Sequence, residues 1–156
     1  MEAHWASVLR LCFRMAGDQN EAEEIAQHTF FLAYRAWESF ERRSAVSTWL
    51  FRIAVNACQR HMIQRQRESV VPFDEQTQPV TYDDDREDLR ELRDRIQTAL
   101  QRISPAHRLV LTLFWIDQLD HGAIAEILGC PLGTAWSRLF YAREALAQQL
   151  GMETER

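Results

Sequence analysis

Hydrophobic residues recur at intervals of three and four along most of the chain, and this spacing predicts helices rather than strands. The segments that carry the pattern are approximately residues 3–16, 18–39, 48–66, 86–103, 105–116, 121–128 and 133–146. The pattern stops over residues 68–85. We therefore expect an all-α protein whose helices fall into two groups.

The residues at the ends of these segments support the predicted helix boundaries. Asp18, which has a glutamate three residues on, matches a capping box, and Asp120 is a suitable N-cap. Ser104 is an N-cap followed by proline at the first helical position. Gly17 and Gly129 provide stops, because glycine adopts the left-handed conformation that ends many helices.

The interruption in the middle of the chain predicts a linker. It contains Pro72, Pro79 and three consecutive aspartates at 83–85. Residues 68–103 carry ten acidic side chains against five arginines, so the net charge of −5 is concentrated there. We expect two small helical domains, residues 1–67 and 88–156, joined by a flexible acidic linker over residues 68–87.

Composition excludes several classes of protein. With 46% hydrophobic and 26% charged residues, the chain can build a core. It has only five glycines and four prolines, and this scarcity of turn-forming residues favours helices. It has no apolar run that could span a bilayer and no signal peptide, so we expect a cytoplasmic protein without membrane insertion. The three cysteines and five histidines show no metal-ligand or catalytic spacing. We therefore expect no metal, no cofactor and no enzymatic activity.

The segment from residue 121 onward has the pattern of a helix-turn-helix. Gly129 and Pro131 separate two short apolar-periodic helices, and Ala125 is small enough for them to cross closely. An ordinary helical hairpin is the alternative interpretation. The outward side of the second helix would carry one basic residue among six, namely Thr134, Trp136, Ser137, Arg138, Phe140 and Tyr141.

The long helix over residues 48–66 has one apolar side and one polar side. Arg52, Asn56 and Arg60 share the polar side, one turn apart, with Ile63 and Arg67. This side is either a solvated surface or a surface for nucleic acid.

Two parts of the chain resemble one known family, the extracytoplasmic-function (ECF) group of bacterial RNA-polymerase sigma factors. The sequence IAEILGCPLGTAWSRL at 124–139, with AREAL at 142–146, resembles sigma region 4. Gly17-Asp18, AEEIAQ at 22–27 and Phe30 resemble the part of region 2 that docks on the polymerase clamp. TWLFRIAVN at 48–56 resembles the helix that reads the promoter −10 element. Two motifs in the right order are far more specific than either alone.

The resemblance implies a function and the residues that carry it. The chain would direct core RNA polymerase to promoter DNA, assist promoter opening, and be controlled by an anti-sigma factor. The polymerase would bind Glu23, Glu24 and Gln27. The −10 element would contact Trp49, Arg52, Asn56 and Arg60, with the loop at 40–47 closing a pocket for a flipped base. The −35 element would contact the six outward residues of the second helix-turn-helix helix. The alternative is a sigma-like regulator that acts through protein contacts without initiating transcription.

The sequence departs from the family pattern at five positions. His28 and Arg60 stand where the family often has acids, whereas Phe114, Trp136 and Tyr141 stand where it commonly has basic residues. The three aromatics remove phosphate contacts, so we expect weak −35 binding. An aromatic outer face could instead serve a partner protein.

Overall fold

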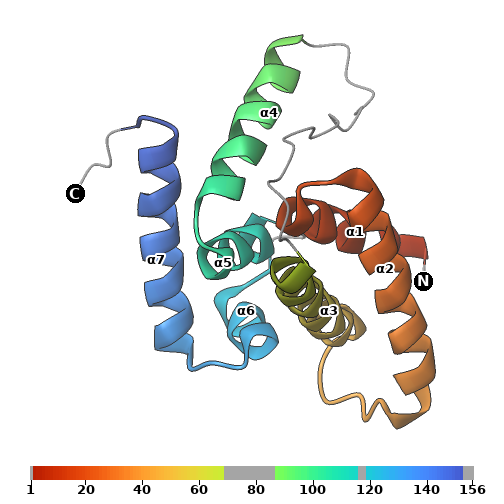
Figure 1. Ribbon diagram of the computed structural model, residues 1–156. Helices are drawn as coiled ribbons and strands as arrows, with labels where there is room; N and C mark the ends of the chain where they lie inside the picture. The colour runs from red at the N-terminus through yellow and green to blue at the C-terminus, as the bar shows by residue number, and fades with distance from the viewer. Residues whose placement is uncertain (1, 69–86, 116–118, 153–156) are drawn as a thin grey trace.

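The computed structural model describes residues 2–68, 87–115 and 119–152, and these ranges contain only helices and their connections (Figure 1). The all-α prediction is therefore confirmed. The elements are α1 (Glu2–Ala16), α2 (Gln19–Ala36), the 3-10 turn η1 (Trp37–Ser39), α3 (Val46–Glu68), α4 (Glu87–Arg102), α5 (Pro105–Trp115), α6 (His121–Leu128) and α7 (Leu132–Gln149). Apart from its two end residues, the predicted linker lies outside the described ranges.

Local capping explains where several helices begin and end. The Asp18 carboxylate accepts the backbone N–H of Glu21 at 2.9 Å, and Asp120 accepts that of Ala123 at 2.8 Å. The capping box predicted at Asp18 is only half formed, because the Glu21 carboxylate binds the Arg65 guanidinium at 3.1 Å instead of capping back. Gly129 ends α6 with a φ of 64°, as expected for a glycine stop.

The N-terminal half is a bundle of α1, α2 and α3. Its fully buried core includes Leu11, Ala26 and Phe51. Cys12 and Cys58 are also buried there, and their Sγ atoms lie 3.9 Å apart as free thiols. The contact with Cys58, together with burial, raises the pKa of the Cys12 thiol well above its usual range. The sequence pattern did not indicate this proximity.

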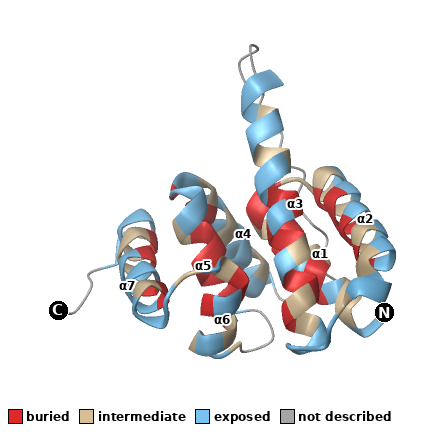
Figure 2. Cartoon of the chain, turned by 90° about the horizontal axis from the view of Figure 1, so that it is seen from below, coloured by how far each residue is buried: buried red, intermediate tan, exposed pale blue. Residues whose placement is uncertain are grey.

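The C-terminal half consists of α4 to α7, with α5 at its centre. Val110, Leu111 and Leu113 of α5 are completely buried. The inner face of α7 consists of Ala135, Leu139, Ala142 and Leu146, which are all buried. Figure 2 shows the buried positions gathered on the faces that the helices turn toward one another.

The two halves pack against each other. Helix α1 contacts α4 and α5, and α3 contacts α6 (Figure 1). Buried side chains of both halves form one continuous cluster. As a result, the helix predicted to read the −10 element, α3, lies beside α6, the first helix of the predicted helix-turn-helix.

Candidate nucleic-acid interface

The three predicted polymerase-binding residues lie on α2. Glu24 and Gln27 are exposed, and Glu23 is half-buried. The Glu23 carboxylate accepts a hydrogen bond from the side-chain amide of Gln19 at 2.8 Å. This bond holds the carboxylate against the surface of the first turns of α2. Residues three and four apart share a helix side, so this stretch of α2 presents an acidic, amide-bearing surface.

A groove of about 320 Å³ runs between α2 and α3. Glu24 and His28 line it from α2, while Arg60 and His61 line it from α3. His61 also approaches the Glu21 carboxylate, at 3.5 Å. The groove therefore brings a residue predicted to bind polymerase, Glu24, next to one predicted to bind the −10 element, Arg60.

The polar side of α3 forms a ridge open to solvent. Arg52, Asn56 and Arg60 are all exposed along it, and Ile63 is 52% exposed. Three of the four side chains predicted for the −10 element are thus available to an extended ligand. The ridge carries one amide, that of Asn56, with one guanidinium group on each side of it. This arrangement suits a base edge that is flanked by phosphates.

Trp49, the fourth predicted −10 residue, is half-buried in an aromatic cluster. Its ring centroid lies 4.7 Å from that of Phe40 and 5.9 Å from that of Trp37. The cluster joins the end of α2 to the start of α3 and so anchors both ends of the connection over residues 40–45. Trp37 and Phe40 are not among the residues predicted for the −10 element, although their spacing of three, close to Trp49, was a usable signal.

The predicted −35 residues lie on α7, the second helix of the predicted helix-turn-helix. Trp136, Ser137, Arg138, Phe140 and Tyr141 are exposed, and Thr134 is half-buried. The Ser137 hydroxyl donates to the Gly133 carbonyl at 3.0 Å, which leaves its oxygen free to accept a hydrogen bond from outside. The outward side expected from the sequence is therefore present, and it is mainly aromatic.

Two of the departures from the family pattern meet in space through His121. The His121 ring stacks on Trp136, with centroids 3.6 Å apart and planes inclined by 10°. The centroid of the Phe114 ring lies 5.8 Å from that of His121, and the Arg143 Cζ atom lies 4.7 Å from the centroid of the Phe114 ring, above its face. Phe114, His121 and Trp136 thus belong to one aromatic unit, which spans α5, α6 and α7. This unit holds the Trp136 ring in place while half of that residue stays exposed.

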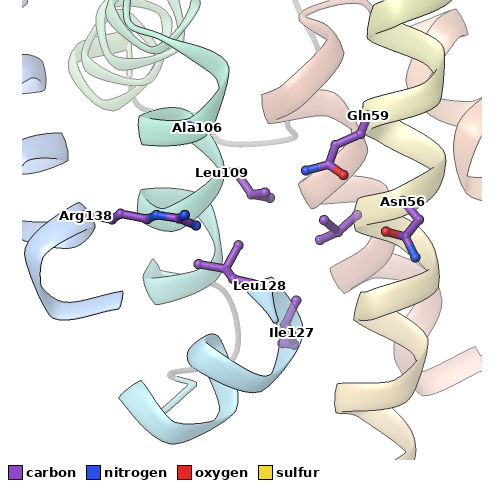
Figure 3. Close-up of a pocket in the computed structure, with 8 residues that line it drawn as sticks. Asn56, Gln59, Ala106, Leu109, Ile127, Leu128 and Arg138 are labelled. Carbon is purple, nitrogen blue, oxygen red and sulfur yellow. The ribbon is translucent and has the colours of Figure 1, made fainter. Parts of the chain in front are cut away.

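One pocket connects the two predicted DNA-binding surfaces. It has a volume of about 110 Å³ and lies where the two halves meet (Figure 3). Asn56 and Gln59 line it from α3, and Leu128 and Arg138 line it from α6 and α7. A residue predicted for the −10 element and one predicted for the −35 element therefore face the same small space.

Within the described ranges, no three His, Cys, Asp or Glu side chains are grouped so that they could hold a metal ion. No helix in these ranges is both long enough and apolar enough to cross a membrane.

Comparison with known proteins identifies both halves. Residues 1–68 match the family Sigma-70 region 2, and residues 93–146 match Sigma-70, region 4. The RNA polymerase sigma-H factor of Pseudomonas aeruginosa is 34% identical over 154 residues, covering 92% of this chain and 80% of that protein. The ECF RNA polymerase sigma factor SigW of Bacillus subtilis is 32% identical, covering 92% and 82%.

Solved structures agree with this assignment. The sigma factor RpoE of Bartonella quintana, solved in complex with the anti-sigma factor NepR, superposes with a TM-score of 0.78 at 25% identity, covering 98% of this chain and 97% of that one. CnrH, solved with the cytosolic domain of CnrY, shares the fold with a TM-score of 0.72 at 20% identity, covering 98% of this chain and 86% of that one. With both sigma regions present in order and relatives above 30% identity over most of its length, the chain belongs to the ECF group of RNA-polymerase sigma factors.

Proposed function

We propose that this chain binds core RNA polymerase, directs it to promoters and helps to open them. The N-terminal half reads the −10 element and the C-terminal half holds the −35 element. The observation that carries the proposal is the occurrence of both family regions in one chain, each with most of its predicted contact side chains exposed. We place residues 1–67 and 88–156 as the two functional domains.

Polymerase docking rests on α2. Glu23 and Glu24 offer carboxylates to basic side chains of the clamp, and Gln27 adds an amide on the same side. Exposed charges of this kind steer association and set orientation, so reversing their sign would repel the same partner.

Reading of the −10 element rests on the α3 ridge. The Asn56 amide has two donors and one acceptor, which match the edge of an unpaired base. Arg52 and Arg60 lie one turn on either side and neutralise phosphates. The aromatic cluster around Trp49 anchors the connection before α3, which closes over the flipped base.

Contact with the −35 element rests on α7. Ser137 and Arg138 contact base edges, Thr134 holds the backbone at the start of the helix, and Phe140 meets a thymine methyl group. Trp136 and Tyr141 bring no positive charge, so few phosphates are neutralised and this contact is weak.

The chain carries out no covalent chemistry and needs no cofactor, because the polymerase supplies the catalysis. It acts in the cytoplasm, where polymerase and DNA are found, and an anti-sigma factor controls it. Support for such a partner comes from the two structural neighbours, each solved with an anti-sigma factor or the cytosolic domain of its partner protein.

Run-off transcription tests the proposal. The chain is mixed with core polymerase, and templates are chosen by sequencing the transcripts that appear when it is overproduced. Defined transcripts that depend on the chain support the function. Co-purification with polymerase but no transcript on any template would favour the second candidate, a regulator acting through protein contacts. The exposed aromatic side of α7 is the observation that favours that candidate.

A further inference from the structure

Three aromatic rings dominate the outward side of α7. Trp136 is 51% exposed, Phe140 59% and Tyr141 58%. Ser137 and Arg138 are exposed on the same side, next to these rings. Large apolar side chains that gather on one exposed side of a helix mark an interaction surface. This side of α7 is therefore suited to a ligand that presents apolar groups next to polar ones.

The Trp136 ring is fixed in its orientation before any ligand binds. The His121 ring of α6 stacks on it at a centroid distance of 3.6 Å, with the two planes inclined by 10°. The Phe114 ring of α5 lies behind His121, at 5.8 Å between ring centroids. A side chain that is already held in place loses little conformational entropy on binding. The exposed part of the Trp136 ring is thus a preformed contact surface.

The Phe140 ring is held by its neighbour. The Tyr141 ring meets it edge-on, with centroids 5.4 Å apart and planes inclined by 83°. Phe140 follows Trp136 by four residues, so the two positions share one side of the helix and lie about 6 Å apart along its axis. Two preformed aromatic surfaces therefore follow each other along the outward side of α7.

The major groove of DNA presents an apolar group to such a surface, namely the C5 methyl of thymine. The groups that guanine, cytosine and adenine present there are hydrogen-bond donors and acceptors. Two base-pair steps rise about 6.8 Å, which is close to the spacing between the positions of Trp136 and Phe140. The Ser137 hydroxyl and the Arg138 guanidinium lie beside the rings, where they can bond the polar atoms of adjacent bases. A thymine-bearing base edge fits this mixture better than a wholly apolar protein surface.

We propose that Trp136 and Phe140 determine promoter specificity by covering two thymine methyl groups of the −35 element, and that His121 positions Trp136 for this contact. The proposal rests on the −35 contact proposed above for α7. It makes the contact of Phe140 one of a pair and places the two thymines about two base pairs apart, on either strand. Because methyl contacts involve no charge, they give specificity where few phosphates are neutralised.

The test removes methyl groups from the DNA and leaves the protein unchanged. Deoxyuridine pairs with adenine as thymine does but lacks the C5 methyl. The probe is a promoter found by sequencing the transcripts that appear when the chain is overproduced, made with deoxyuridine at every thymine of its −35 element. The control probe carries the same number of deoxyuridines in the spacer between the −35 and −10 elements. Core polymerase carrying the full chain is titrated against each probe.

The quantity measured is the deoxyuridine deficit, the factor by which affinity falls when thymine is replaced. Burial of one methyl-sized group changes affinity about fourfold, so the loss of two should give a deficit of roughly fifteenfold. The control probe should bind as tightly as the promoter that contains only thymine. The deficit should be the same at about 50 mM and about 200 mM salt, because a methyl contact releases no counterions.

Variants assign the methyl groups to individual rings. With Trp136→Ala the deoxyuridine deficit should fall to about fourfold, because only the methyl group under Phe140 remains to be lost. The control Gln148→Ala changes an exposed position near the end of α7 and should keep the full deficit. Circular dichroism verifies that each variant is folded.

Two substitutions of His121 test its positioning role. His121→Ala removes the stacked ring and frees Trp136, so the deoxyuridine deficit should fall toward about fourfold. His121→Phe restores a flat ring at the same place. The Nε2 atom of His121 is buried and has no hydrogen-bond partner among the described residues, so phenylalanine forfeits no bond of that atom. This variant should recover the deficit of roughly fifteenfold.

Equal binding of the thymine and deoxyuridine probes would overturn the proposal and assign the aromatic side of α7 to a partner protein. A deficit that persists in full with Trp136→Ala, or one that disappears at the higher salt, would also overturn it. An unchanged deficit with His121→Ala would remove His121 from the proposal. Failure of the proposed function is a different result, because run-off transcripts would then be absent even from the promoter that contains only thymine.

Discussion

Arg108 is a buried cation whose hydrogen-bond partners are all backbone carbonyls, and its replacement by methionine tests what that arrangement contributes to stability. Arg108→Met keeps a long side chain but leaves the carbonyls of Met15 and Leu100 without their donor. Each unsatisfied buried acceptor costs about 1–3 kcal/mol. Burial also lowers the pKa of the Arg108 guanidinium, with the nearby Arg65 charge adding to the effect. Methionine removes that desolvation penalty and offsets part of the loss.

The expected net effect is a loss of about 2–4 kcal/mol in the free energy of unfolding, against a typical total of roughly 5–15 kcal/mol for a domain. Urea unfolding followed by circular dichroism measures it as a midpoint lowered by about 1–2 M. The control, Arg102→Met, replaces an exposed arginine near the end of α4 and should stay within about 0.5 kcal/mol of the unmodified chain. Equal stability of the two variants would refute the reasoning, since the desolvation penalty would then cancel the hydrogen bonds.

Three further predictions concern the proposed contacts. Reversing Glu23 and Glu24 to arginine should abolish pull-down of core polymerase while helicity is retained; an unchanged pull-down would remove α2 from the docking site. Asn56→Ala should weaken −10 recognition by about 1–3 kcal/mol, the scale of one base-edge contact, with normal folding because the side chain is exposed. Permanganate footprinting of the opened promoter, together with a thermal melting curve of the protein, checks this prediction. Loss of folding with normal promoter opening would contradict it. Trp136→Arg/Tyr141→Arg should tighten binding of a −35 duplex and steepen its salt dependence by roughly one unit per added contact. No gain would mean that this side of α7 does not face DNA.

Much of the local structure could be predicted from the sequence because its causes are local. Helical periodicity marked the faces that are buried, and the N-caps Asp18 and Asp120 marked where two helices begin. The glycine stop at Gly129 placed the turn between α6 and α7. The exposed side of α7 followed from the same periodicity, as did the exposed side of α3. The assignment of these sides to polymerase and DNA came from the family resemblance.

Other features depend on which helices meet, and a periodic pattern does not contain that information. It shows that a helix side is covered but not which helix covers it. The 3.9 Å contact between Cys12 and Cys58 and the stacking of His121 on Trp136 each join residues on separate helices. The half-formed capping box at Asp18 also results from contact between separate helices, because the Arg65 guanidinium of α3 binds the Glu21 carboxylate of α2.

The association of the two halves is the largest feature of this kind. The sequence divided the chain correctly into helices and indicated two groups of them, but it contained no sign that α1 would end against α4 and α5. Arg108 was visible only as a lone charge in an apolar helix, and Gln97 and Gln101 as ordinary polar residues of a solvated side. Their role arises because carbonyls at the end of α1 accept hydrogen bonds from these three side chains, and only the packed tertiary structure brings those side chains within hydrogen-bonding distance. The Phe13 carbonyl also accepts the backbone N–H of Gly17, so the Arg14 and Met15 carbonyls depend most on this packing.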